Sequence, residues 1–347
     1  MKIPILFVSL AFLYPLMAHE GHEPTADAES AQMAATAEMA KAAKSFLALL
    51  DEKEKKETVF DFKDDDRENW HYVPTDRKGV RLDTLAIEKQ HLAHAILAGG
   101  LSHKGYLTAN QIMSLEAYLA AKEKNPAYRN PGKYFLAIFG TPAAKGTWAW
   151  RFEGHHLSVN LTFVDGKAQD SPTFFGTNPA EIQDGPRKGQ RPLGEIEDAA
   201  RALATELQKA GQRVVFTDKA PAEIITGQER SFKAFADEGV HSAKLDDAGR
   251  KKILALFNTI YAYQRAELGA AELQKLREQD DKKITFAWAG SLERGQAHYF
   301  RLQSPDIVIE YANTQNNANH AHLTFRNIHD DFGRDLLKEH YEHGHEE

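Results

Sequence analysis

The apolar residues of the chain follow a helical period in some stretches and form strand-like runs in others. Large apolar residues three or four positions apart share one face of a helix and so predict an amphipathic helix. Runs of aromatic and β-branched residues broken by glycine predict strands. We expect helices over 27–56, 82–97, 108–124, 195–210, 246–264, 266–279 and 334–342, and strands within 134–163 and over 213–217, 283–290, 297–303, 306–312 and 320–327.

Helical and strand-like stretches are segregated along the chain rather than alternating. This order predicts an α+β fold, with an antiparallel or mixed sheet and segregated helices in a single large domain. No internal repeat at a fixed period is visible. Residues 171–194 hold four prolines and four glycines, too many chain breakers for regular structure. We expect a long loop there, beside the histidine segments described below, as the wall or lid of a pocket.

The first 18 residues have the anatomy of a signal peptide. Lys2 precedes an apolar run, and Ala18 is a small residue at the expected cleavage position. The run is too short to cross ~30 Å of hydrocarbon, so we expect a periplasmic or secreted protein with no membrane span after cleavage. The predicted parts are a signal peptide at 1–18, a disordered or loosely helical lead at 19–38, one globular domain at 39–343 and a His/Glu-rich tail end at 344–347.

Cleavage after Ala18 would make His19 the N-terminal residue. The amine and imidazole of an N-terminal histidine can chelate copper, and His22 could complete such a site. The alternative is a solvated lead segment, which is favoured because termini are usually loosely held and Leu16 is larger than the residue expected two positions before a cleavage site.

Composition narrows the candidate chemistry. The 347 residues include 43 Lys and Arg against 50 Asp and Glu, a net charge of −7, so we expect no concentrated positive surface for nucleic acid. The absence of cysteine excludes thiol nucleophiles, disulfides and cysteine-ligated metals. The unusual number is 16 histidines, and a bound metal would have to use imidazole, carboxylate, amide, backbone or water ligands.

Two adjacent histidines end an aromatic stretch, WAWRFEGHHLSVN. Alternation on a strand places Arg151, Glu153 and His155 on one face and His156 on the other. Gly154 can bend the backbone, and a bend could direct both imidazoles to one place. The alternative is a histidine that only makes ordinary cross-strand hydrogen bonds.

A second pair of histidines lies in the stretch NHAHLTFR. Alternation places His320, His322, Thr324 and Arg326 on one strand face. Two imidazoles two residues apart leave a rigid backbone in the same direction, which suits one shared metal ion. The alternative is a polar hairpin whose histidines are exposed by chance.

Other groups near the C-terminus could contribute. Glu310 precedes the second histidine pair and Asp330 follows it, so either carboxylate could join the site, whereas Asp331 is expected to cap the terminal helix. The tail is typical of a solvated segment that binds transition metals weakly, through His340, His343 and His345.

Seven segments are distinctive as a set: W-x-Y-x-P at 70–74, an LSxxGY-like segment at 101–106, YFLAIFGTP, WAWRFEGHHLSVN, FFGTNPAEIQDGPRKGQRPL, YFRLQSPDIVIEYANTQNNANHAHLTFRN and DFGRDLLKEHY. From about Lys41 to Tyr341 the chain resembles the bacterial domain-of-unknown-function 3500 family. The resemblance implies a single domain and frequent export, but it implies no reaction. The function must therefore be argued from the residues.

The residues favour an exported metal-dependent enzyme, hydrolytic or oxidative. We expect a divalent zinc, copper or iron ion, held by some of His155, His156, His320, His322 and Asp330. Two or three imidazoles and one carboxylate leave a position open for an activated water. Catalytic roles are expected for Glu153, Glu310, Arg151 and Arg326, with an arginine holding an anionic group of a small-molecule substrate.

Two other functions fit the same sequence. A non-catalytic periplasmic metal-binding or metal-handling protein would collect ions with its terminal histidine clusters. A carbohydrate-binding module would stack sugar on Trp148 and Trp150 beside the Gly/Pro-rich loop. A tightly held metal with an exchangeable water in a substrate-sized cleft would distinguish the enzyme from the carrier.

Overall fold

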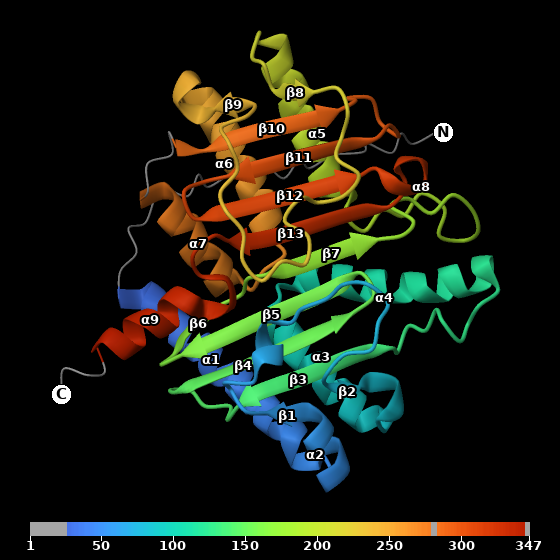
Figure 1. Ribbon diagram of the computed structural model, residues 1–347, viewed down its shortest axis with the longest axis vertical. Coiled ribbons are helices and arrows are strands. Elements are labelled where there is room, and N and C mark those ends of the chain that lie inside the picture. The colour runs from blue at the N-terminus through green and yellow to red at the C-terminus, as the bar shows by residue number, and fades with distance from the viewer. Residues whose placement is uncertain (1–25, 279–282, 344–347) are drawn as a thin grey trace, which may run out of the picture.

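The computed structural model describes residues 26–278 and 283–343 (Figure 1). One mixed sheet of 13 strands runs through these residues, with the main order β1-β3-β4-β5-β7-β13-β12-β11-β10-β8. The strands are β1 (Val59–Phe60), β2 (Val80–Arg81), β3 (Tyr134–Gly140), β4 (Thr147–Gly154), β5 (Leu157–Val164), β6 (Lys167–Gln169), β7 (Thr173–Thr177), β8 (Val215–Thr217), β9 (Val240–His241), β10 (Thr285–Gly290), β11 (His298–Gln303), β12 (Ile307–Asn313) and β13 (Ala321–Asn327). The helices are α1 (Ala26–Leu49), α2 (Glu52–Thr58), α3 (Ile87–Gly100), α4 (His103–Glu123), α5 (Gly194–Lys209), α6 (Asp247–Tyr261), α7 (Ala266–Glu278), α8 (Gln315–Ala318) and α9 (Arg334–His343).

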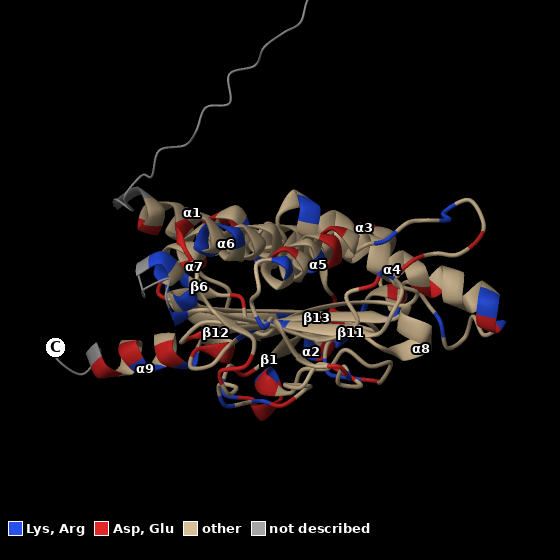
Figure 2. Cartoon of the chain, turned by 90° about the horizontal axis from the view of Figure 1, so that it is seen from above, with Lys and Arg blue, Asp and Glu red and all other residues tan. Residues whose placement is uncertain are grey.

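Helices α1 and α3 to α7 cover one face of the sheet, whereas the other face is covered by loops, with α9 at its margin (Figure 2). On the helix face, Phe325 packs against Tyr261 of α6, and Trp150 lies close to Gly100 of α3. The side chains between the layers belong to one large apolar cluster that is buried from end to end of the sheet. Removing this apolar surface from water is the main favourable term in folding.

The loop face is polar although it is buried. Alternate positions of the strands place Arg151, Glu153, Arg301, Glu310 and Arg326 there, each 2% exposed or less. Two segments, 61–79 and 218–239, lie over them and contribute backbone donors and acceptors as partners. Buried charges of this kind are tolerated only when they are paired and hydrogen-bonded.

The two halves of the sheet repeat one arrangement. One half of the sheet has the order β1-β3-β4-β5-β7 from its edge to the centre, and the other half has the order β8-β10-β11-β12-β13. The halves meet at the antiparallel pair of β7 with β13. At each edge a short strand pairs in parallel with its neighbour, β1 with β3 and β8 with β10. Each half also has a helix pair before its long strands, α3 with α4 and α6 with α7. The molecule therefore has an approximate two-fold arrangement that the sequence does not reveal as a period.

Sequence and structure differ at two places that matter for the site. The predicted loop 171–194 contains β7, a central strand whose neighbours are β5 and β13. The predicted disordered or loosely helical lead extends to residue 38, but helix α1 already begins at Ala26. Within it Ala35 is buried, and the hydroxyl of Thr36 donates to the carbonyl of Gly166. Among the described residues, no helix is long and apolar enough to cross a bilayer. The expected signal peptide, His19 and His22 lie outside the described residues.

Candidate metal centre

Three imidazoles converge at one end of the central strands. His156 Nε2 lies 2.8 Å from His320 Nε2, and His322 Nε2 lies 3.0 Å from the same atom. Among the described residues this is the group of histidines and carboxylates arranged to hold a metal ion, with ligand atoms all within 4.8 Å of one another. One member comes from the turn between β4 and β5, and the other two come from the start of β13.

Strand β7 brings these distant segments together. It pairs with β5 on one side and with β13 on the other, so the turn after β4 lies beside the first residues of β13. Gly176 stands opposite His322 in the β7–β13 pair, and its N–H donates to the carbonyl of His156 at 2.7 Å. A Cβ at Gly176 would lie 2.9 Å from His156 Cδ2 and 3.0 Å from His322 Cδ2. The missing side chain leaves room for both rings.

His156 owes its position to an unusual backbone. Its φ is +64°, a left-handed conformation that is uncommon for residues other than glycine, although histidine, like asparagine and aspartate, adopts it more often than most. Its N–H donates to the carbonyl of Tyr72 at 2.9 Å, which anchors the turn to the 61–79 segment. Such outliers persist where the surroundings hold them, and they cluster at functional sites.

A carboxylate behind the group orients His322. The Nδ1–H of His322 donates to Glu223 Oε1 at 2.6 Å, which leaves Nε2 free to face the other rings. Glu223 is itself held by the N–H of Ile224 and by Gln315 Nε2, both at 2.8 Å. Burial raises the pKa of the Glu223 carboxyl, but the hydrogen bond and charge of His322, with the N–H of Ile224 and the nearby His320, together outweigh this and lower the pKa. Metal-bound histidines commonly have such a carboxylate on the second ring nitrogen.

Burial favours the neutral form of His156 and His320. It lowers the pKa of His156 well below the ordinary value, and the neighbouring histidines lower it further. Burial and His322 lower the pKa of His320 to about 3. Tyr72 and Phe174 close the space beside His322 with rings stacked at 3.8 Å. Neutral imidazole is the form that binds metal.

The donor set fits a transition-metal ion. At a metal–nitrogen distance of ~2.0–2.1 Å, two ligands of a tetrahedral ion lie about 3.3 Å apart, close to the 2.8 and 3.0 Å that separate Nε2 of His320 from Nε2 of His156 and of His322. Without an ion, a proton on Nε2 of His320 can serve only one of its two close contacts at a time, because a neutral imidazole carries a single ring N–H. The three lone pairs are better satisfied by one cation.

His155 is not part of the group, although it was one of the expected ligands. Its ring stacks on His156 with centroids 3.7 Å apart, and its Nδ1 lies 2.5 Å from Glu116 Oε1. Arg129 also approaches the same nitrogen at 3.1 Å. The structure therefore separates the two adjacent histidines, with His156 in the group and His155 packed against its outer face.

The expected catalytic residues Arg151 and Glu153 fasten the 61–79 segment. Arg151 pairs with Asp66 at 2.7 Å and lies 3.0 Å from Glu153. Glu153 accepts the N–H of His71 at 2.9 Å. The partners of both side chains are structural groups of the covering segment rather than the histidine group.

Glu310 and Arg326 hold the second covering segment in the same way. Glu310 accepts the N–H groups of Ile225 and Thr226 at 2.6 and 2.9 Å. Arg326 pairs with Asp331 at 2.7 Å and donates to the carbonyl of Glu229. Asp331 is therefore an ion-pair partner and not the expected helix cap.

Asp330, the expected carboxylate ligand, caps the terminal helix instead. Its Oδ1 accepts the N–H groups of Asp335 and Leu336, and its Oδ2 accepts Gln169 Nε2. The structure does not bring it to the histidine group. Trp148 and Trp150, the expected sugar platform, are 0% and 1% exposed in the core.

The histidine tail lies apart from the group where it is described. His340 pairs with Asp165 at 2.8 Å, and the side chain of His343 and residue His345 lie outside what the structure describes. The expected wall is present in part, because Gly176 borders His156 and His322. Sequence reasoning missed Glu223, which lies in an irregular segment with no pattern to single it out.

Fold and site together define an α+β protein with a candidate three-histidine metal centre. A family model described as "Protein of unknown function (DUF3500)" matches residues 32–334, and the chain belongs to this family. No curated protein and no solved structure matches the chain.

Proposed function

We propose that the protein is an exported enzyme that uses one metal ion held by His156, His320 and His322. The convergence of their three Nε2 atoms carries the proposal. Two of the histidines are fixed on or beside a central strand, and rigid elements give ligands the precision that catalysis needs. Three protein ligands leave a fourth position for water or substrate, as in catalytic zinc sites.

Zinc is the ion we expect. The group contains three imidazoles and no carboxylate, whereas non-haem iron oxygenases typically use two histidines and a carboxylate. Glu223 contacts the nitrogen of His322 that faces away from the other rings, so it orients a ligand and does not supply one. A bound zinc ion would act as a Lewis acid and lower the pKa of its water, which suits hydrolysis.

The chain's own groups prepare the site for that chemistry. Glu223 fixes the ring orientation and tautomer of His322, and Gly176 leaves room for the rings. Tyr72 and Phe174 supply an apolar wall that limits water near the ion. A dry, shaped surrounding strengthens electrostatic interactions with bound substrate.

Metal analysis tests the proposal directly. The exported protein, purified without a histidine tag, should contain about one equivalent of zinc by elemental analysis, and N-terminal sequencing should show cleavage after Ala18. His322→Ala should lose this metal, whereas His340→Ala should keep it, because His340 pairs with Asp165 outside the group. Cobalt substituted for zinc should give the visible absorption of a tetrahedral site.

The alternative function is a metal carrier, and the same variants distinguish it. A carrier that collects ions through its histidine tail would lose tight metal in His340→Ala and retain it in His322→Ala. That result, or protein that binds no metal tightly, would overturn the proposed enzyme.

A further inference from the structure

A pocket of about 380 Å³ lies where the turn before β13 meets the 180–191 segment and the start of α5. Ligand pockets commonly measure roughly 300–1,000 Å³ and are mostly apolar. This one is unusual because its side chains are mainly polar. Five carboxamides contribute to its lining, namely Gln183, Asn313, Asn316, Asn317 and Asn319.

The pocket shares a wall with the histidine centre. Asn313 lines the pocket, and its Oδ1 accepts the N–H of His320 at 3.0 Å. Asn319, another lining residue, directly precedes His320 in the chain. His320 is the only partly exposed member of the group, since His156 and His322 are buried. The histidine rings are not part of the pocket lining, so a molecule there would contact the two residues that adjoin the His320 backbone, Asn313 and Asn319.

Hydrogen bonds between the 178–181 and 316–319 loops hold the wall of the pocket in place. Asn319 Oδ1 accepts the N–H of Glu181 at 2.7 Å, and its Nδ2 donates to the carbonyl of the same residue at 3.1 Å. Asn316 Nδ2 donates to Asn178 Oδ1. Asn316, Asn317 and Ala318 all have left-handed φ values, between 51° and 57°. Three such residues in succession are costly and are held only by a well-determined surrounding.

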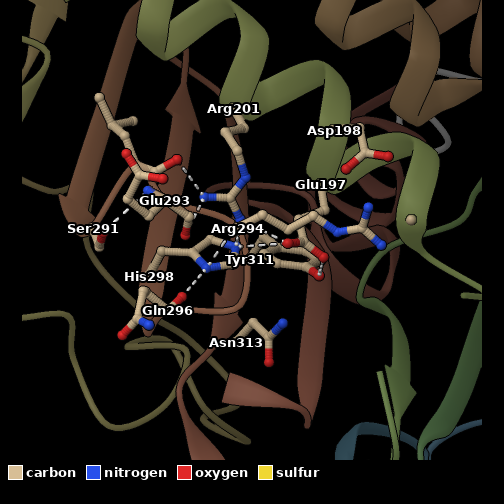
Figure 3. Close-up of polar contacts among 12 residues, drawn as sticks. Glu197, Asp198, Arg201, Ser291, Glu293, Arg294, Gln296, His298, Tyr311 and Asn313 are labelled. Atoms are coloured by element: carbon tan, nitrogen blue, oxygen red, sulfur yellow. Dashed lines mark hydrogen bonds and ion pairs between the residues drawn. The ribbon is translucent and has the colours of Figure 1, made fainter. Parts of the chain in front are cut away.

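The charged side chains of the pocket already have ionic partners (Figure 3). Glu197, 4% exposed, accepts Arg201 at 2.7 Å, Arg191 at 3.0 Å and the hydroxyl of Tyr311 at 3.2 Å. Arg191 is also paired with Asp198 at 2.7 Å. At the rim, Arg294 pairs with Glu181 at 2.8 Å. Two arginines therefore face two glutamates, and a charged ligand would have to break an existing ion pair.

In the described part of the chain some carboxamide atoms of the pocket have no partner, whereas both polar atoms of Asn319, Nδ2 of Asn316 and Nε2 of Gln183 are engaged. Within the described residues, the side chain of Asn317 makes no hydrogen bond, and neither does Nδ2 of Asn313, a residue only 3% exposed. Each amide offers both a donor and an acceptor. A hydroxyl group also donates and accepts, so vicinal hydroxyls match such a surface, whereas phosphate or ammonium groups do not.

We propose that this pocket binds a neutral polyhydroxylated molecule, a sugar or sugar-like polyol, and presents it to the metal centre. The binding step stands on the pocket alone, and its role as substrate recognition rests on the proposed function. This replaces the anionic substrate expected from Arg151 and Arg326, because both arginines are committed to structural partners.

Binding measurements with defined probes test the inference. A panel of neutral monosaccharides and disaccharides is compared by titration calorimetry with inorganic phosphate and with choline, on metal-loaded and chelated protein. At least one neutral sugar should bind in both forms of the protein, and neither phosphate nor choline should compete with it. Asn317→Gly, which suits the left-handed backbone, should weaken sugar binding about tenfold, the loss of one or two hydrogen bonds.

Two further variants separate the possible outcomes. Arg294→Gln should change sugar affinity less than Asn317→Gly, and Asn258→Ala, an exposed asparagine of α6 that does not line the pocket, should leave it unchanged. Phosphate binding that Arg294→Gln abolishes, or a lack of binding by every neutral sugar, would overturn the inference. Sugar binding by a protein that takes up no metal tightly when metal is supplied would uphold the pocket and overturn the metal centre, and tight metal uptake without sugar binding would do the reverse.

Discussion

The two ends of the central strand pair share one scaffold and differ in their chemistry. At one end the turn between β4 and β5 carries His156, whose carbonyl accepts the N–H of Gly176 at 2.7 Å. At the other end the turn between β11 and β12 carries Asp306, whose carbonyl accepts the N–H of Ile328, also at 2.7 Å. The backbone repeats, but only the first end gathers three imidazoles among the described residues.

The second end holds a pocket of about 340 Å³ instead of a metal group. Its lining includes Asp306, Asp330, Glu272 and Lys275, and Asp330 is occupied in capping α9. The repeated backbone therefore offers two equivalent positions for a functional site, one at each end of the β7–β13 pair. The side chains at each end determine whether a metal group forms there. Fold alone does not determine function.

Replacing His156, in the turn between β4 and β5, should have the largest effect on metal affinity. His156→Asn keeps a residue that tolerates the left-handed backbone but removes one of three metal ligands, so metal affinity should fall by more than about 100-fold, beyond the effect typical of a ligand's outer partner. Asp306→Asn, the equivalent change at the other end, should leave metal content unchanged. Competition with a chelator measures both, and equal losses in the two variants would contradict the distinction between the ends.

Removing the carboxylate behind His322 should have the next largest effect. Glu223→Ala leaves Nδ1 of His322 without its acceptor, and loss of such a partner typically weakens metal binding 10–100-fold. Glu223→Gln should recover part of the affinity because its amide oxygen still accepts. Gln315→Ala removes a neighbour that contacts only Glu223 Oε2 and should have a small effect. Unchanged zinc affinity in Glu223→Ala would show that the carboxylate does not support the centre.

Adding a methyl group at Gly176 of β7 should lower metal affinity, because it disturbs the end of the strand pair that carries the histidines. The added Cβ of Gly176→Ala would meet both His156 and His322 at 2.9–3.0 Å, so the rings must move. Metal affinity should fall about tenfold, and overpacking should destabilise the fold by about 1–3 kcal/mol. Ile328→Ala is the matched change at the other end and should leave metal affinity intact. Equal metal affinity in Gly176→Ala and the unmodified protein would contradict the tight fit.

The strand pattern predicted the pairing of His320 with His322, because alternation continues from β13 to the residue just before it. It could not choose between His155 and His156, since that choice depends on the left-handed backbone of His156. Glu223 escaped detection because it lies in an irregular segment whose position is set by long-range contacts.

The same limit applies to the expected catalytic residues, whose partners the sequence could not predict. Charged residues within apolar strands are typical of active sites, but Arg151 and Glu310 have backbone partners 80 or more positions away in the sequence. Strand β7 was hidden by the prolines and glycines around Phe174 and Phe175, although its burial between β5 and β13 makes it the centre of the sheet. The two-fold arrangement was invisible because it is a property of strand order rather than of residue identity.

A smaller effect is expected beside the second end, at Asp170. This carboxyl is 4% exposed, its Oδ2 has no hydrogen-bond partner, and burial together with Glu272 raises its pKa to about 7, while Lys275 opposes the rise. Tyr261 of α6 lies in the same surroundings. Because the folded pKa exceeds the unfolded one, the stabilisation is complete below about pH 4 and is lost as the pH rises to about 7.

Asp170→Asn should remove this dependence, because the amide stays neutral at every pH. Its free energy of unfolding should match that of the unmodified protein near pH 4 and exceed it at pH 8 by on the order of 4 kcal/mol. Denaturant unfolding at the two pH values measures the difference, with Asp237→Asn in the exposed part of the 218–239 segment as control. A variant that is no more stable at pH 8 than at pH 4, relative to the unmodified protein, would mean that Asp170 is charged in the folded state. The metal content should be unaffected throughout, since the buried acid belongs to the end of the scaffold that did not become the metal centre.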